Sequence, residues 1–288
     1  MRGAQFGQQG SDCRDVSRTF ARTCEVAVAK AGFDVRRSFA LAVLAGLQIS
    51  LGASFMLVVK ADLGLSFAVS QLLGGLCFSL GLFLVAVAGG ELFTGNNLML
   101  VGLLEGSFGP TCLLRSLVVV YLGNLAGSLL AVGLVLAADL QGLGGGVVGD
   151  AAITVASAKC ALPWGTSFFR GVLCNVLVCL AVWCCFSGRS VVDKLSACLL
   201  PVAAFVACGF EHCVANMFFL PLGFALASDG SVTLAGIASN LTACTLGNLM
   251  GGMVVVAGLY WLALGGRRTE GSGQPSGVAP ADGREARR

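Results

Sequence analysis

Residues Glu91-Leu92-Phe93-Thr94-Gly95-Asn96 interrupt a long apolar run of this chain, and Glu211-His212-Cys213-Val214-Ala215-Asn216 interrupt a second run in its other half. Both stretches have the pattern Glu-x-x-x-x-Asn, and each is followed by Leu-Gly-Asn-Leu, at 122–125 and at 246–249. A third correspondence joins residues 42–46 (Ala-Val-Leu-Ala-Gly) to residues 171–175 (Gly-Val-Leu-Cys-Asn). Interrupted hydrophobic segments at corresponding positions of two halves are typical of a transport site near the bilayer midplane.

The composition is that of a membrane protein. Hydrophobic residues make up 56% of the chain and charged residues 11%, and the mean hydropathy is +0.87, whereas a soluble domain carries about 25% charged residues. The small excess of basic residues lies at the termini and in short links, so it does not indicate a nucleic-acid partner. The thirteen cysteines have no Cys-x-x-Cys spacing and lie mostly in apolar runs, where cysteine is a small packing residue. We therefore expect no cofactor and no metal.

Six segments are long and apolar enough to span a bilayer, since a spanning helix needs about 20 mostly apolar residues. They lie near 38–59, 67–104, 115–138, 165–186, 195–227 and 233–264. The second and fifth are longer than one span and carry Glu91 and Glu211 inside them, so we predict that both are broken helices. Three spans per half make the halves inverted repeats. The predicted fold is all-α, with six transmembrane helices in two inverted three-helix repeats.

The regions outside the spans complete the predicted organisation. Residues 12–33 place Val16 and Phe20 on one face and Arg18 and Arg22 on another, as in a helix that lies in the membrane interface. The predicted parts are an N-terminal interfacial helix (1–37), a first repeat (38–140), an extracytoplasmic link (141–164), a second repeat (165–265) and a disordered tail (266–288). Lysine and arginine favour the termini and the links on their side, so the chain is expected to cross the cell (inner) membrane several times with both termini in the cytoplasm.

Ionisable side chains inside spans are rare and carry function or structure. Glu91 and Glu211 are the only acidic residues inside the predicted spans. Each carboxylate either lines the pathway or braces its broken helix by accepting hydrogen bonds from unpaired backbone amides. The symmetric recurrence favours the brace, which would include Asn96 and Asn216.

His212 is the only histidine of the chain, and Leu92 occupies the matching position of the first half. This asymmetry at a helix break points to a function, because an imidazole donates a hydrogen bond to an anion or passes it a proton. Lys159 lies outside the fourth span, either as an ordinary interfacial lysine or as a group that concentrates anions at a pore mouth. Four apolar residues flank the interruptions and either form constrictions or simply pack between helices: Phe78, Leu82, Phe93 and Phe205.

The chain resembles the formate–nitrite transporter family across nearly all of residues 12–265. Residues 90–96 (Gly-Glu-Leu-Phe-Thr-Gly-Asn) are similar to the first signature of the family, residues 170–183 to the second, and residues 209–217 (Gly-Phe-Glu-His-Cys-Val-Ala-Asn-Met) to the third and most specific. The resemblance implies an aquaporin-like protomer, a homopentamer and one pore in each subunit.

The resemblance also implies roles for single residues. Thr94 matches the mobile loop at the first break, Lys159 the vestibule lysine, and Asn175 and His212 the central polar pair. The constrictions of the family match the four apolar residues named above. Asn97 and Cys213 depart from the usual residues of the family, which leaves the choice of anion open.

The predicted function is the movement of a small monovalent anion, such as formate or nitrite, by a channel or by proton symport. Hydrosulfide, acetate, lactate and bicarbonate remain alternatives, and the anion crosses either as its neutral acid or with a proton from His212. An aquaporin-like channel for neutral solutes is the alternative of another class, but none of the six prolines follows an asparagine, as the Asn-Pro-Ala motifs would require. An enzyme would need a convergent catalytic set, and an inert scaffold would not need a repeated polar break.

Overall fold

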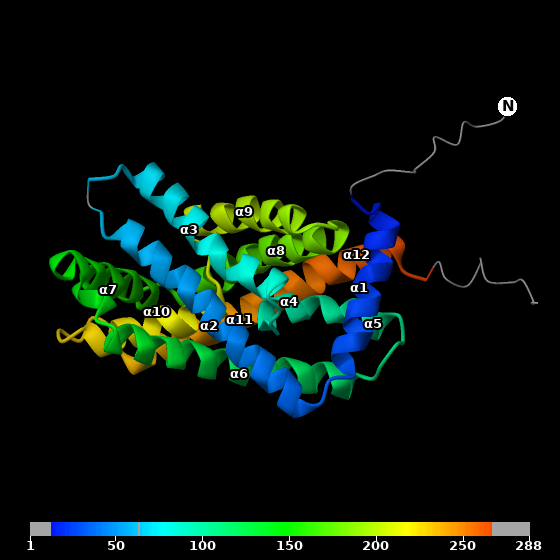
Figure 1. Cartoon of the computed structure of the whole chain (residues 1–288). Coiled ribbons are helices and arrows are strands. Elements are labelled where there is room, and N and C mark those ends of the chain that lie inside the picture. The colour runs from blue at the N-terminus through cyan, green and yellow to red at the C-terminus, as the bar shows by residue number, and fades with distance from the viewer. Residues whose placement is uncertain (1–12, 63, 267–288) are drawn as a thin grey trace, which may run out of the picture.

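The computed structural model describes residues 13–62 and 64–266, and within that part of the chain all regular structure is helical. Figure 1 shows the helices as a bundle. In chain order they are α1 (Val16–Ala31), α2 (Val35–Lys60), α3 (Phe67–Val87), α4 (Phe93–Asn96), the 3-10 helix η1 (Asn97–Met99), α5 (Leu100–Leu104), α6 (Pro110–Ala137), the 3-10 segment η2 (Leu140–Gly146), α7 (Val147–Cys160), α8 (Trp164–Ser187), α9 (Val191–Ala207), α10 (Cys213–Leu226), α11 (Leu234–Leu249), the π-helix η3 (Met250–Gly258) and α12 (Leu259–Leu264).

The helices agree with six spans, of which the second and fifth are broken. Among the described residues, five helices are long and apolar enough to cross a membrane: α2, α3, α6, α8 and the continuous helix 234–264. Two shorter apolar helices, 93–104 and 213–226, continue α3 and α9 after each break. The predicted all-α membrane fold is confirmed.

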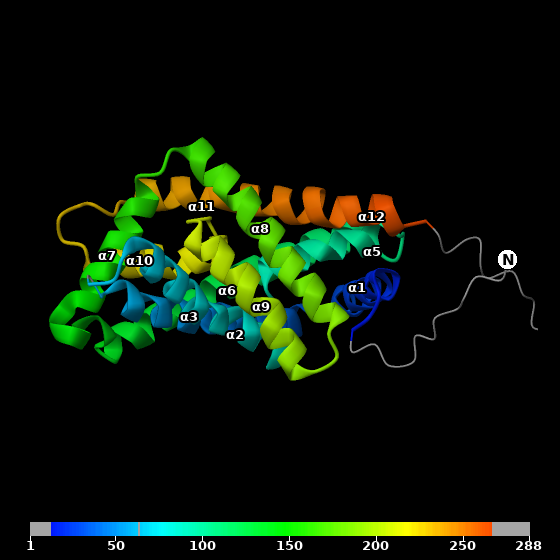
Figure 2. The same ribbon diagram turned by 90° about the horizontal axis from the view of Figure 1, so that it is seen from above.

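The two halves have the same packing and opposite directions. Helix α2 packs against α3 and α6, and α8 packs in the same way against α9 and α11. Figures 1 and 2 show α2 running from the end that holds α1 towards the end that holds α7, whereas α8 runs back from α7. Helix α1 precedes the first half, and helix α7 precedes the second half. Helix α7 lies inside the segment that the sequence analysis predicted only as a link.

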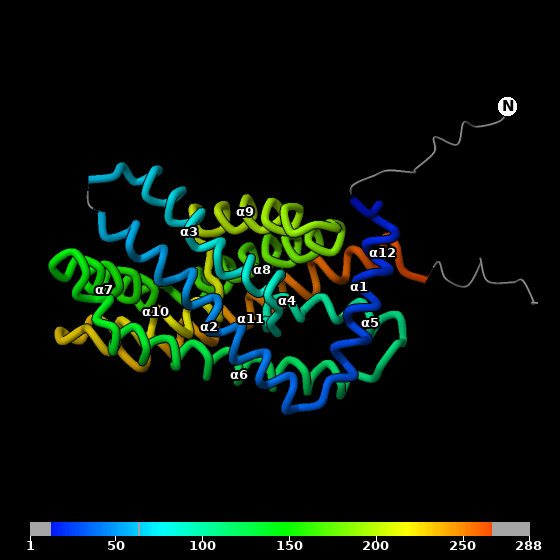
Figure 3. Tube along the Cα trace, viewed as in Figure 1, coloured from blue at the N-terminus to red at the C-terminus, as the bar shows by residue number. Residues whose placement is uncertain are grey.

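Each broken helix ends at a glycine with a left-handed backbone. Gly89 has φ 92° and Gly209 has φ 67°, a conformation that glycine adopts without a steric penalty. Glu91 and Glu211 follow two positions later. Leu92 and His212 then have an extended backbone, and the helix resumes at α4 and α10. Figure 3 shows both interruptions in the interior of the bundle, between its two ends.

Matching glycines let the helices of each half approach closely. A Cβ atom on Gly127 of α6 would lie 2.0 Å from the carbonyl oxygen of Val43, and one on Gly251 of η3 would lie 2.2 Å from that of Val172. Small residues allow such contacts in lipid, where no hydrophobic force draws helices together.

The ends of the chain differ in part from expectation. The buried residues of α1 include Phe20 and Cys24, which pack in one cluster with Val101 and Trp183. The apolar face expected to meet lipid therefore packs largely on the protein. The predicted disordered tail, apart from residue 266, lies outside the described residues.

Candidate functional site

Two cavities enter the bundle from opposite ends. The first, of about 420 Å³, is called the Lys30 cavity. The second, of about 440 Å³, is called the Lys159 cavity. The charged residues lining the first are Lys30, Arg37, Lys194 and Glu91, and those lining the second are Lys60, Lys159, Arg170 and Glu211. Each cavity thus has three basic side chains and one carboxylate, an excess of positive charge that attracts anions.

A polar brace closes the first break. Lys30 Nζ lies 3.1 Å from Glu91 Oε1 and donates to Asn96 Oδ1 at 2.7 Å. Asn96 Nδ2 donates to Glu91 Oε2 at 2.7 Å. The three side chains therefore form a closed set, in which the buried carboxylate has a charged and a neutral donor.

The second break carries the matching brace. Lys159 Nζ donates to Glu211 Oε1 at 2.8 Å, and Asn216 Nδ2 donates to Glu211 Oε2 at 2.7 Å. Asn240 adds a donor to the same oxygen at 3.2 Å. The Lys159 side chain is 15% exposed, so it faces the cavity while it is paired.

Lys30 was not predicted as a site residue, although the sequence contains a signal for it. Lys30 lies five residues before the start of α2, and Lys159 lies five residues before the start of α8. In an amphipathic segment Lys30 looks like a solvated surface residue. Only the packing of α1 against the first break shows that it matches Lys159.

At each break, a backbone N–H group that has no partner within the helix donates to an asparagine side chain and not to the glutamate carboxylate. Phe93 N donates to Asn124 Oδ1 at 2.9 Å, and Cys213 N donates to Asn248 Oδ1 at 2.9 Å. Each asparagine also donates through Nδ2 to the backbone oxygen of the nearby glutamate, at 2.8 Å and 2.9 Å. The expectation that Glu91 and Glu211 accept from these amides was wrong. The Leu-Gly-Asn-Leu repeats supply the acceptors.

Thr94 and His212 meet between the two cavities. Thr94 Oγ1 lies 3.0 Å from His212 Nε2, and the Ala215 amide donates to His212 Nδ1 at 3.1 Å. In a neutral imidazole one nitrogen accepts and the other donates. Since Nδ1 accepts from a backbone N–H, the proton of the neutral ring lies on Nε2 and points at Thr94. His212 is 3% exposed and lines the Lys159 cavity.

Asn175 supports Thr94 from α8. Its Nδ2 donates to the carbonyl oxygen of Asn248 at 2.6 Å and to that of Thr94 at 3.4 Å. A Cβ atom on Gly252 of the π-helix would lie 2.4 Å from this Nδ2, so the backbone there closes against Asn175. The amide is directed at backbone oxygens, and Asn175 lines neither cavity.

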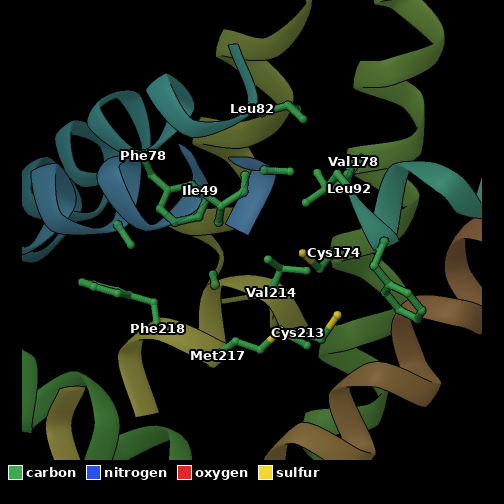
Figure 4. Packing of buried hydrophobic residues seen from close by; sticks show 14 of the residues in the cluster. Ile49, Phe78, Leu82, Leu92, Cys174, Val178, Cys213, Val214, Met217 and Phe218 are labelled. Carbon is green, nitrogen blue, oxygen red and sulfur yellow. The ribbon is translucent and has the colours of Figure 1, made fainter. Parts of the chain in front are cut away.

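Rings and aliphatic side chains fill the space around this pair. The Phe205 ring stacks on His212 at 5.9 Å between centroids, and Phe78 meets Phe205 edge-on at 5.8 Å. Both phenylalanines line the Lys159 cavity, while Leu82 lines the Lys30 cavity. Figure 4 shows Leu82 in the same group of buried side chains as Leu92 and Val214.

Phe93 takes a different place from the other three apolar residues. It lines neither cavity, and its ring meets Tyr121 edge-on at 5.0 Å. The Tyr121 hydroxyl is in turn 3.1 Å from Thr245 Oγ1. The structure therefore brings together Phe78, Phe205 and His212, and directs Phe93 towards α6.

The comparisons with known proteins agree with this architecture. The family model described as Formate/nitrite transporter matches residues 17–262. The formate channel FocA of Escherichia coli (strain K12) is 37% identical over 256 residues, which cover 83% of this chain and 90% of that protein. The nitrite transporter NirC of Salmonella typhimurium (strain LT2) is 38% identical over 227 residues, covering 76% and 80%.

Solved structures extend the likeness to three dimensions. A pentameric formate channel with formate bound has a TM-score of 0.73 at 39% identity, over 80% of this chain and 97% of that chain. An aquaglyceroporin from Plasmodium falciparum has a TM-score of 0.50 at 15% identity, over 80% and 100%. The second likeness concerns the fold alone, and it confirms the predicted aquaporin-like architecture.

Proposed function

Because the chain belongs to the formate/nitrite transporter family, we propose that it moves formate or nitrite across the membrane through a pore within each subunit. The observation that carries the proposal is the pair of basic cavities with the Thr94–His212 hydrogen bond between them. A pathway of this kind collects anions at either end and exposes them to one polar contact inside an apolar barrier.

The cavities perform the first step, which is capture. In the Lys159 cavity the charge of Lys159 is largely balanced by Glu211 at 2.8 Å. The remaining positive charge comes from Lys60 and Arg170, which line the same cavity. A monovalent anion is therefore attracted by the net positive charge of the whole cavity and not by Lys159 alone. This extends the predicted role of Lys159 to a group of three basic residues.

The apolar barrier performs the second step, which is neutralisation. An anion between Phe78 and Phe205 on one side and Leu82 on the other loses most of its water. A medium of low dielectric constant disfavours the charged form of an acid. The anion then takes up a proton from the water of the cavity and crosses as formic or nitrous acid.

His212 assists this crossing as a neutral hydrogen-bond donor. A positively charged ring would need a second proton on Nδ1, where the Ala215 N–H already points. The ring therefore keeps its Nε2 proton and offers it, with the Thr94 hydroxyl, to the oxygen atoms of the acid. Asn175 is a positioning residue, because its Nδ2 donates to the carbonyl oxygen of Thr94.

The assembly and the topology follow from the same proposal. The related formate channel is pentameric, and this chain is proposed to form a homopentamer with its own pore in every subunit. The proposal keeps the predicted parts of the chain: the N-terminal helix (1–37), the first repeat (38–140), the link (141–164), the second repeat (165–265) and the tail (266–288). It also retains the placement of both termini in the cytoplasm. We propose no catalytic activity.

Uptake by proteoliposomes tests the function. Proteoliposomes that contain the purified protein should take up labelled formate and nitrite faster than protein-free vesicles do. Native mass spectrometry of the protein should give the mass of a pentamer. Competition by hydrosulfide, acetate, lactate and bicarbonate ranks the remaining anions. Glycerol uptake without anion uptake would instead indicate a channel for neutral solutes, and no uptake of any solute would contradict transport.

A further inference from the structure

A pair of cysteines lies at the wall of the Lys30 cavity, and the proposed transport steps use neither of them. Cys185 on α8 and Cys198 on α9 have their Sγ atoms 3.6 Å apart. The two residues are 5% and 0% exposed. Helices α8 and α9 are joined by a short turn, 188–190, and the pair connects the last turn of α8 to the middle of α9.

Cys185 differs from the deeply buried cysteines in its access to water. It lines the Lys30 cavity next to Phe186 and Lys194, whereas Cys174 and Cys179 line neither cavity. A small oxidant that enters the cavity can therefore reach the Cys185 sulfur. Cys198 does not line the cavity, and its sulfur lies 3.6 Å from the Cys185 sulfur.

We propose that Cys185 and Cys198 are a modification site, which forms a reversible disulfide in the presence of hydrogen peroxide. The Cys185 thiolate attacks one peroxide oxygen and becomes a sulfenic acid, and the other oxygen leaves as water after protonation. The Cys198 thiol then attacks the sulfenic sulfur and releases a second water. The two thiols lose two electrons, and the peroxide gains them.

The geometry needs only a small movement for this bond. A disulfide has an S–S length of about 2.05 Å, so the two sulfur atoms must approach by about 1.5 Å. A pair that is reduced in the usual reducing interior of a cell becomes oxidised only when peroxide is present. Thiol reductants restore it.

The disulfide would act on the wall of the cavity through Lys194. The Cys185 thiol contacts the Lys194 carbonyl oxygen at 3.8 Å. The Lys194 ammonium group donates to the carbonyl oxygen of Ala86 at 3.4 Å, and Ala86 lies near the end of α3, before the first break. The bond would fix the middle of α9 against the end of α8, beside Lys194, so we expect it to lower anion uptake. This last effect rests on the proposed function, whereas the bond itself does not.

Peptide mapping of the full-length protein in proteoliposomes tests the site directly. The protein is treated with hydrogen peroxide, remaining thiols are alkylated, and cleavage at Arg189 and Lys194 separates the two cysteines. We expect a Cys185–Cys198 cross-linked peptide that disappears with dithiothreitol. The Cys184→Ser variant, which lacks the exposed neighbour of Cys185, should keep the cross-link, and Cys198→Ser should lose it.

Uptake under the same treatment tests the consequence. Formate uptake by the wild-type protein should fall with peroxide and return with dithiothreitol, and uptake by a Cys185→Ser/Cys198→Ser variant should not change. Absence of the cross-linked peptide from peroxide-treated wild-type protein would overturn the site. An equal fall in the double variant would overturn its regulatory effect. A cross-link in a protein without any uptake would leave the site standing and contradict the transport function alone.

Discussion

Thr94 Oγ1 and His212 Nε2 lie 3.0 Å apart although 118 residues separate them in the chain. Thr94 follows the first helix break and His212 lies at the second, so this bond joins the two halves inside the barrier. The positions that match them in the opposite halves hold Val214 and Leu92. Because neither side chain can form hydrogen bonds, this polar pair occurs only once, although the surrounding structure is repeated in both halves.

Phe205 and Phe93 are predicted to differ in their effect on selectivity. Phe205 stacks on His212 and lines the Lys159 cavity, so Phe205→Ala should widen the barrier and raise lactate uptake relative to formate uptake. Phe93 packs on Tyr121, so Phe93→Ala should leave this ratio unchanged and lower stability by about 3 kcal/mol. Phe224→Ala, at a ring that is 44% exposed, is the control. Equal lactate uptake by the Phe205 and Phe93 variants would contradict this assignment.

The ion pair of Lys159 and Glu211 is predicted to be structural as well as electrostatic. Lys159→Met leaves the Glu211 carboxylate buried without its cation, and loss of one partner of a buried pair costs about 3 to 5 kcal/mol. The midpoint of urea unfolding in detergent should therefore fall. The double variant Lys159→Met/Glu211→Gln should recover most of the lost midpoint, because the glutamine amide needs no cation. Equal instability of the single and double variants would show that Lys159 contributes by packing alone.

The two asparagines of the Leu-Gly-Asn-Leu repeats are predicted to stabilise the breaks. Asn124→Leu leaves the Phe93 N–H unpaired, and Asn248→Leu does the same to Cys213. A buried donor without a partner costs about 1 to 3 kcal/mol, so both variants should unfold at lower denaturant concentration. Amide hydrogen exchange should rise at Phe93 in the first variant and at Cys213 in the second. Exchange that rises equally at both sites in either variant would contradict the local role.

Gly252 is predicted to set the position of Asn175. A Cβ atom at this glycine would lie 2.4 Å from Asn175 Nδ2, so Gly252→Ala should displace the amide from Thr94 and Asn248. Formate uptake should fall while the pentamer stays intact. Gly133→Ala on α6 is the matched control, since a Cβ atom there would meet no neighbouring group within 4 Å. Normal uptake by Gly252→Ala would show that Asn175 does not position the pathway.

The spans and their breaks were predictable because their signals are local. A long apolar run identifies a span, and a glutamate inside it identifies an interruption, as at Glu91. The helix resumes within a few residues of the predicted position, at Phe93 and at Cys213. Helix α7 was not predicted, because its sequence is only moderately apolar and its packing on α10 appears only in the folded chain.

The partners of the site residues depend on contacts between distant segments. The motif around Asn124 was recognised, but its role as the acceptor for Phe93 N requires the fold. Lys30 is similar, since its bond to Glu91 joins α1 to the first break. The placement of Phe93 away from the cavities also depends on Tyr121, a residue that no motif connected with it.

The role of His212 as a neutral hydrogen-bond donor is tested most directly by formate uptake into proteoliposomes across a range of external pH. The variants are His212→Asn, which keeps a donor, and His212→Phe, which keeps a ring and loses the donor. Since one neutral hydrogen bond is worth about 1 kcal/mol, uptake by His212→Asn should stay within about fivefold of the wild type. Uptake should rise towards acid pH in the wild type, because the anion takes its proton from water, and His212→Asn should keep this rise. His212→Phe should lose uptake at every pH while remaining pentameric. If His212→Asn loses the pH dependence, the proton comes from the imidazole, and the neutral-donor account is wrong.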